Sequence, residues 1–205
     1  MSFEQDEQRN PFGMDEACTA CPKLVHSRES IVHGYGDVTA DFQFIVEAPT
    51  QGADAVGHPT TEDPVVRVLE QMGLVGQDSD SGPELVNAYI THLTRCRHPD
   101  RSPTEAEITE CSAFLSAEIR MINPEILVPV GTRVLRSLAP EYTTLSPEEL
   151  IAEELHGEEV RGRGFELVPM VGRDRLDEDR MAAFVTKFED LMGRDYRQTK
   201  GRRAR

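Results

Sequence analysis

The chain has 205 residues, a formal net charge of −15 and three lysines, while arginine is plentiful. This length suits one domain with a substantial core, and the longest apolar runs, such as residues 126–130, have the length of strands, which excludes a membrane-spanning helix. An acidic, lysine-poor surface suits the salty cytoplasm of a halophile, but an ordinary acidic protein shares this composition, so bulk charge does not exclude nucleic acid as a ligand.

The two ends of the chain differ in charge. Residues 1–14 are acidic and predict a flexible start, which lacks the basic and apolar segments of a secretory signal, so a cytoplasmic protein is expected. One domain, expected to be monomeric, is predicted for residues 15–193. The basic tail at 194–205 fits a disordered segment as well as it fits a DNA-binding arm.

Helix and strand signals alternate in the first half of the chain. Asp63 as the N-cap and Pro64 at the first helical position open a helix. Pro, Gly and Thr mark the segment before it as a loop. The predicted elements, in order, are a helix within 15–30, a strand at Phe42–Glu47, a loop at 48–61, a helix at 63–73 and a polar loop at 75–84.

The second half continues the alternation. Ser102, Pro103 and Glu105 predict a capping box, and the helical spacing that follows turns Cys111 inward. Pro129 indicates the end of a strand or an exposed edge. The predicted elements are strands at 86–93, 125–130 and 166–171, and helices that start near Ser102 and span 131–138, 146–155 and 177–192.

This order of elements predicts a parallel sheet covered by helices on both faces. In such sheets the working loops follow the carboxyl ends of the strands. The predicted working loops are residues 48–61, 92–103, 131–133 and 172–176.

The four cysteines predict a shared metal site. Cys18 and Cys21 form a close pair, whereas Cys96 and Cys111 are fourteen residues apart. Disulfides are not expected in a reducing cytoplasm. One close pair with two distant thiolates is compatible with a [4Fe–4S] cluster, and spacing alone leaves zinc as the alternative.

Several motifs together carry a resemblance to a known family. They are CTAC at 18–21, IVEAPTQGADAVGHP at 45–59, YITHLTRCRHPDRSPTEAEITEC at 89–111 and ILVPVG at 126–131. In this order they resemble the iron–sulfur type of uracil-DNA glycosylase, the fourth family of that superfamily. The resemblance implies a three-layer α/β/α sandwich with a four-stranded parallel central sheet, a [4Fe–4S] cluster on the four cysteines and DNA as the ligand.

The same resemblance implies the positions of the functional residues. Glu47 and Asp54 are the catalytic candidates, and the base pocket would contain Ala48, Pro49, Thr60 and His92. Thr60 replaces the phenylalanine that stacks on uracil, His92 the asparagine that reads its edge, and Gly172 the histidine that stabilises the departing base. As an alternative, the two carboxylates only brace their loop and His92 is a satisfied histidine at a strand end.

Arginines gather at the predicted ligand edge. Arg95, Arg97 and Arg101 lie in the loop after the second strand, and Arg173 and Arg175 lie in the loop after the last one. Arginine binds phosphate bidentately, so we expect DNA contacts here, with pairing to the abundant carboxylates as the alternative.

Two functions follow from these patterns. The first is a divergent DNA glycosylase that excises uracil or another deaminated base in base-excision repair. The second is a catalytically silent iron–sulfur module of the same fold that binds DNA.

Overall fold

The structure is a computed structural model that describes residues 8–79 and 82–194, so most of the basic tail and half of the acidic start lie outside the described residues. Its largest sheet has the strand order β1–β5–β2–β6–β8–β7. The strands are β1 (Tyr35–Gly36), β2 (Phe42–Val46), β5 (Ala88–His92), β6 (Ile126–Pro129), β7 (Val160–Arg161) and β8 (Glu166–Leu167).

The four central strands run parallel, and the two short edge strands run antiparallel to their neighbours. In the middle of the sheet, Phe44 of β2 is opposite both Ile90 of β5 and Val128 of β6. The predicted four-stranded parallel core is therefore confirmed, with an added antiparallel strand at each edge.

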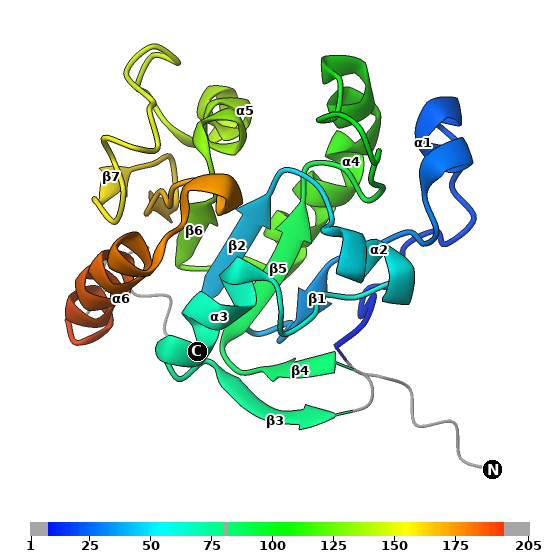
Figure 1. Cartoon of the computed structure of the whole chain (residues 1–205). Helices are drawn as coiled ribbons and strands as arrows, with labels where there is room; N and C mark the ends of the chain where they lie inside the picture. The colour runs from blue at the N-terminus through cyan, green and yellow to red at the C-terminus, as the bar shows by residue number, and fades with distance from the viewer. Residues whose placement is uncertain (1–7, 80–81, 195–205) are drawn as a thin grey trace.

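Helices cover both faces of this sheet (Figure 1). They are α1 (Pro22–Ser27), α2 (Gln51–Val56), α3 (Pro64–Gln71), α4 (Glu105–Ile122), α5 (Thr132–Tyr142) and α6 (Glu178–Met192), and a short 3₁₀ helix, η1 (Arg173–Arg175), precedes α6. The core divides into two main clusters, because alternate strand residues face opposite sides of a sheet. One cluster joins the sheet to α3 and α6, and the other joins it to α4 and α5.

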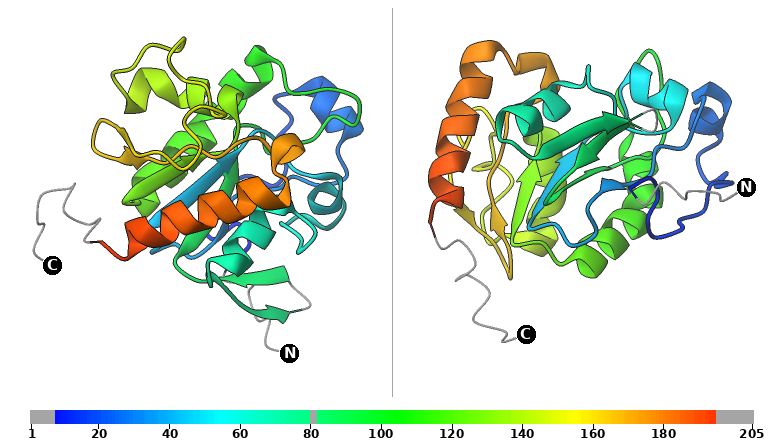
Figure 2. Two further views of the ribbon diagram at one scale, coloured as in Figure 1. Left: turned by 60° about the vertical axis from the view of Figure 1, so that its left-hand side comes forward. Right: turned by 90° about the horizontal axis from the view of Figure 1, so that it is seen from below.

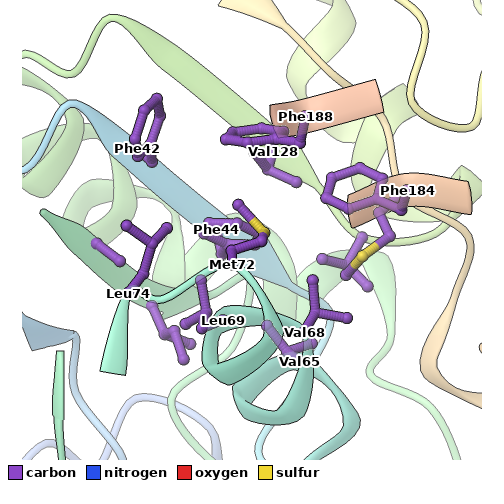
Figure 3. Close-up of a cluster of buried hydrophobic side chains, with 14 of the residues drawn as sticks. Phe42, Phe44, Val65, Val68, Leu69, Met72, Leu74, Val128, Phe184 and Phe188 are labelled. Atoms are coloured by element: carbon purple, nitrogen blue, oxygen red, sulfur yellow. The ribbon is translucent and has the colours of Figure 1, made fainter. Parts of the chain in front are cut away.

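Aromatic side chains fill the first cluster (Figure 3). Phe42 and Phe44 of β2 pack against Phe188 of α6, and the ring centroids of Phe42 and Phe188 are 5.0 Å apart. The helix α6 passes in front of the strands in the left view of Figure 2. The predicted three-layer α/β/α sandwich is confirmed.

Helix starts follow the capping chemistry of the sequence. Asp63 accepts a hydrogen bond from the Val65 amide at the start of α3, as predicted. The capping box of α4 lies two residues later than predicted, because Thr104 and Glu107 exchange the reciprocal bonds. Cys111 is buried on the inner side of α4, which confirms its predicted direction.

Some local predictions were wrong. Residues 48–61 contain the helix α2, because Thr50 caps the amide of Ala53 and Gly57 ends the turn at a φ of +83°. Where a polar loop was predicted, β3 (Val75–Ser79) and β4 (Gly82–Leu85) pair antiparallel, below the main sheet in Figure 1. The expected short helix within 15–30 is α1, but it begins at Pro22 and so does not contain Cys18 and Cys21. Residues 146–155 form turns rather than a helix. None of the described helices is long and apolar enough to cross a membrane.

Candidate functional site

A cavity of about 500 Å³ opens at the carboxyl ends of the central strands. Its lining comes from all four predicted working loops, together with the last residues of β2 and β6 and Glu153. The lining residues that carry charge are Glu47, Arg97, Arg101, Arg133, Glu153, Arg173, Asp174 and Arg175. The parallel topology therefore gathers arginines and carboxylates from segments far apart in the chain around one opening.

Glu47 lies at the end of β2 and lines the cavity. Arg133, in the first turn of α5, donates one hydrogen bond to Glu47 Oε1 over 3.1 Å and a second to Glu105 Oε1 over 2.6 Å. Glu47 and Arg133 are each about one-third exposed (32%), so the carboxylate keeps an accessible side. Glu47 can therefore hold a water molecule or a substrate hydroxyl while Arg133 fixes its direction.

Arg173 lies across the opening in η1. Its Nε donates to Asp63 Oδ1 over 2.9 Å, its Nη2 donates to Asp63 Oδ2 over 2.5 Å, and its Nη1 donates to the carbonyl oxygen of Ala48 over 2.7 Å. The Asp63 side chain is buried, whereas that of Arg173 is 20% exposed and lines the cavity. A buried carboxylate thus fixes one cation in the cavity wall.

The other arginines of the cavity have more exposed partners. Arg101 binds both oxygens of Glu107, at 2.7 and 2.8 Å, and this pairing with the guanidinium lowers the pKa of Glu107 to about 2. Arg175 is 3.3 Å from a carboxylate oxygen of Glu153. Arg97 lines the cavity and donates to the Pro99 carbonyl oxygen over 3.4 Å. The expected alternative of pairing with carboxylates therefore describes several of these residues.

Arg95 does not agree with the predicted DNA contact. It is 1% exposed and forms an ion pair of 2.6 Å with Glu118, which is also buried. The carboxylate of Glu118 accepts further hydrogen bonds from the Gly34 amide and the hydroxyls of Tyr89 and Thr91. The ion pair therefore belongs to the interior, between β5 and α4, where DNA has no access.

The predicted base pocket is only partly assembled. Ala48 and Pro49 line the cavity, whereas Thr60 and His92 are outside its lining. Thr60 lies against α2, because a Cβ added at Gly52 would be 3.2 Å from Thr60 Oγ1. His92 is 1% exposed, its Nδ1 has no hydrogen-bond partner, and burial followed by the nearby Arg173 lowers its pKa well below the usual value. His92 is therefore a neutral, buried side chain.

Asp54, the other predicted catalytic carboxylate, has a different environment from that of Glu47. Its carboxylate is buried and accepts hydrogen bonds from the amides of Glu29 and Ser30, at 3.2 to 3.5 Å. These contacts tie α2 to the segment that follows α1. They match the expected alternative that Asp54 braces a loop through backbone amides.

The four cysteines line one pocket, although they come from three segments of the chain. Burial, followed by the neighbouring Cys111, raises the pKa of Cys21 to about 11. Burial also raises the pKa of the Cys96 and Cys111 thiols. Thiolates in such a place need a nearby positive charge, which a bound metal group supplies.

Two arginines contact this cysteine pocket. Arg28 Nη1 donates to Cys96 Sγ over 3.2 Å, and its Nη2 donates to the carbonyl oxygen of Cys18 over 2.8 Å. The backbone amide of Arg95 donates to Cys111. Within the described residues, however, no group of three or more His, Cys, Asp or Glu side chains could hold a metal ion. The four thiols are suitable ligands for an iron–sulfur group, but their arrangement is not that of a site for a single metal ion.

Sequence reasoning missed three residues of the site. Arg133 lies within 131–133, one of the predicted working loops, so its position was an available signal. Asp63 was recognised only as a helix cap, since nothing in the sequence connects it to Arg173, 110 residues away. Glu153 lies in a segment predicted to be helical.

Comparisons with known proteins agree with this architecture. The model of the Uracil DNA glycosylase superfamily matches residues 33–183. A type-4 uracil-DNA glycosylase of Thermotoga maritima is 33% identical over 58% of this chain and 58% of its own length. For the type-4 uracil-DNA glycosylase of Sulfurisphaera tokodaii, the identity is 35% over 56% of this chain and 50% of its own. A type-5 uracil-DNA glycosylase of Pyrobaculum aerophilum is 26% identical over 59% of this chain and 64% of its own length. The chain thus spans roughly half to two-thirds of the length of these curated relatives.

Proposed function

Because the chain belongs to the Uracil DNA glycosylase superfamily, we propose that it is a divergent DNA N-glycosylase that excises uracil or another deaminated base from DNA. The observation that carries this proposal is the carboxylate of Glu47, which lines the cavity and is directed by Arg133. Glycosidic hydrolysis needs such a group, because water is a weak nucleophile until its proton has an acceptor.

The proposed reaction hydrolyses the bond between the sugar and the base. The bond between the sugar C1′ and the base nitrogen breaks, and its electron pair leaves with the base. The oxygen of water bonds to C1′, and Glu47 accepts one proton of that water. The other proton remains on the new sugar hydroxyl. Asp54 takes no part in this scheme, because backbone amides occupy its carboxylate.

DNA is the proposed ligand because cations from separate loops surround the same opening. Arg97, Arg101, Arg133 and Arg175 line it, and phosphate contacts orient a duplex or a single strand over such an edge. The base would then leave the stack to reach Glu47, at a cost of a few kcal/mol in unstacking.

A [4Fe–4S] cluster is the proposed resident group of the cysteine pocket, held by Cys18, Cys21, Cys96 and Cys111. One close cysteine pair with two distant thiolates is compatible with such a cluster, and tetrahedral zinc on the same thiolates is the alternative. When bound, the cluster supplies positive iron to buried thiolates and joins three segments. One of those segments continues into the loop of Arg97 and Arg101, which lines the cavity.

A silent DNA-binding module is the second candidate. Thr60 and His92 are outside the cavity lining, and His98 supplies the one aromatic ring of that lining among the described residues. A base held without a larger stacking ring loses about 1–3 kcal/mol of binding energy. This observation favours binding without excision.

Single-turnover assays separate the two candidates. The full chain with its cluster is incubated with duplex and single-stranded oligonucleotides that carry uracil, hypoxanthine or xanthine, at several salt concentrations, and abasic sites are counted. A glycosylase releases at least one base, and Glu47→Gln slows the release by on the order of 100-fold or more.

The matched variant is Glu105→Gln, which removes the other carboxylate on Arg133 but leaves Glu47 in place. It should retain most of the rate. Binding to these oligonucleotides without release of any base would support the silent module, and equal losses in both variants would contradict the role of Glu47.

A further inference from the structure

Arg173 is held in the cavity wall by a carboxylate whose side chain is 1% exposed. Both oxygens of the buried Asp63 accept from it, and the Ala48 carbonyl oxygen accepts a third hydrogen bond. Asp63 itself is held in place, since its Oδ1 also caps α3 at the Val65 amide. The guanidinium plane is therefore set by two elements, β2 with its following loop and the start of α3.

The contacts leave part of the guanidinium free. Arginine has five N–H donors, and three of those of Arg173 are used in these bonds. One N–H remains on Nη1 and one on Nη2. Because the side chain lines the cavity and is 20% exposed, these donors are available to a ligand in the cavity.

Gly172, the residue before Arg173, has no side chain that could supply a positive charge. A Cβ added at Gly172 would be 2.7 Å from Asp174 Oδ1 and 3.8 Å from the Cα of Gly131. A larger side chain at position 172 therefore requires the Asp174 carboxylate to move. The positive group on this wall of the cavity comes from position 173 instead.

We propose that Arg173 is a catalytic residue that donates hydrogen bonds to the oxyanion developing on the departing base, and that Asp63 is its positioning residue. This inference rests on the proposed glycosylase function. Donors already aimed at the place where charge develops need no rearrangement during the reaction, and for that reason they stabilise the transition state strongly.

The experiment compares two leaving groups. Single-turnover rates of the full chain are measured at saturating enzyme on oligonucleotides with uracil or 5-fluorouracil, whose anion is the more stable because fluorine withdraws electrons. Arg173→Gln should lower the uracil rate by on the order of 100-fold and the 5-fluorouracil rate by clearly less. Asp63→Asn, which keeps a capping oxygen for α3, should shift the same ratio in the same direction by up to about 100-fold through misplacement.

The control and the double variant guard against trivial effects. Arg120 is exposed on α4, where its Nε donates to the Ser116 carbonyl oxygen, and it lies outside the cavity lining, so Arg120→Gln should leave both rates unchanged. Combining Arg173→Gln with Asp63→Asn removes both charges and leaves no buried carboxylate unpaired. It should fold and keep the altered ratio.

Three outcomes would overturn the inference. Equal losses on both bases, with weaker binding of all DNA, would mean that Arg173 contacts a backbone phosphate instead. Unchanged rates in Arg173→Gln would remove its role while the glycosylase function stands. Absence of base release by the wild-type chain would remove the proposed function, and this inference with it.

Discussion

The buried ion pair between Arg95 and Glu118 makes a strong prediction about stability. Substitution of Glu118 by Gln removes the negative charge and keeps one oxygen, which at the Oε1 position can still accept from Gly34 and Tyr89. The side chain of Arg95 is 2% exposed, so its charge would remain in the interior without a counterion. The variant therefore leaves a buried cation without a counterion and places an amide donor where Oε2 accepted from Arg95 and Thr91.

The expected loss is large for a single atom exchange. Removing one partner of a buried pair costs about 3–5 kcal/mol, whereas an exposed pair contributes about 0–1 kcal/mol. For a domain of this size, each kcal/mol shifts the midpoint of thermal unfolding by about 2–4 °C. Glu118→Gln should therefore lower the midpoint by roughly 6–20 °C.

Two further variants make the reasoning refutable. Combining Glu118→Gln with Arg95→Met removes both charges at nearly constant volume and should recover most of the loss. Glu158→Gln breaks the exposed pair with Lys187 and should leave the midpoint almost unchanged, because solvent screens this pair. Thermal unfolding followed by circular dichroism, without oxygen, measures all of them. If Glu118→Gln costs no more than Glu158→Gln, or if the double variant recovers nothing, the assignment of a charge effect is refuted.

Three other predictions concern the cluster, pH and DNA. Arg28→Gln should lower the iron and sulfide bound per chain after gel filtration, because Arg28 joins the Cys96 sulfur to the Cys18 carbonyl, whereas the exposed Arg120→Gln should not. Burial lowers the pKa of His92, so the unfolded chain binds more protons than the folded chain below about pH 6.5. The free energy of unfolding therefore falls as the pH decreases from that value. His92→Gln should reduce the slope of this free energy against pH by up to about 1.4 kcal/mol per pH unit between pH 6.5 and 5.5. Arg97→Gln should weaken binding to all DNA sequences equally and lower the salt slope by about 1.

Each of these predictions has a result that contradicts it. Full iron content in Arg28→Gln would mean that the four thiolates hold the group unaided. An unchanged pH slope in His92→Gln would mean that the histidine is protonated in the folded state. A change of sequence preference in Arg97→Gln would place its guanidinium on a base edge instead of a phosphate.

Local signals predicted the elements that hold the site. The strands β2, β5 and β6 are short, continuous apolar runs, a pattern that parallel burial imposes, and Asp63 and Asp177 cap the helices where the sequence places them. Because the carboxyl ends of parallel strands share one edge, the loops that line the cavity followed from the strand positions alone.

Long-range pairing was outside the reach of those signals. Arg95 stands among arginines in a loop, and only the fold shows that it points inward to Glu118 on α4. The strands β3 and β4 have the polar composition of a loop. They are strands because they pair with each other, and they lack the apolar alternation that indicates a strand in the sequence. Thr60 and His92 stand in motif positions, but the packing of α2 and the burial of β5 keep both out of the cavity lining.

The burial of each partner carboxylate sorts the arginines of this acidic chain into two kinds. Arg175 pairs with the partly exposed Glu153, and Arg133 shares Glu105, whose side chain is 81% exposed. Pairs of this kind contribute about 0–1 kcal/mol, so a DNA phosphate can replace the carboxylate at little cost. Arg173 is different, because release from the buried Asp63 would leave a carboxylate without a counterion, at about 3–5 kcal/mol. Mobile arginines suit the capture of DNA in any sequence, and a fixed one suits a reacting group whose position must not change, so affinity and chemistry can be altered separately in this cavity.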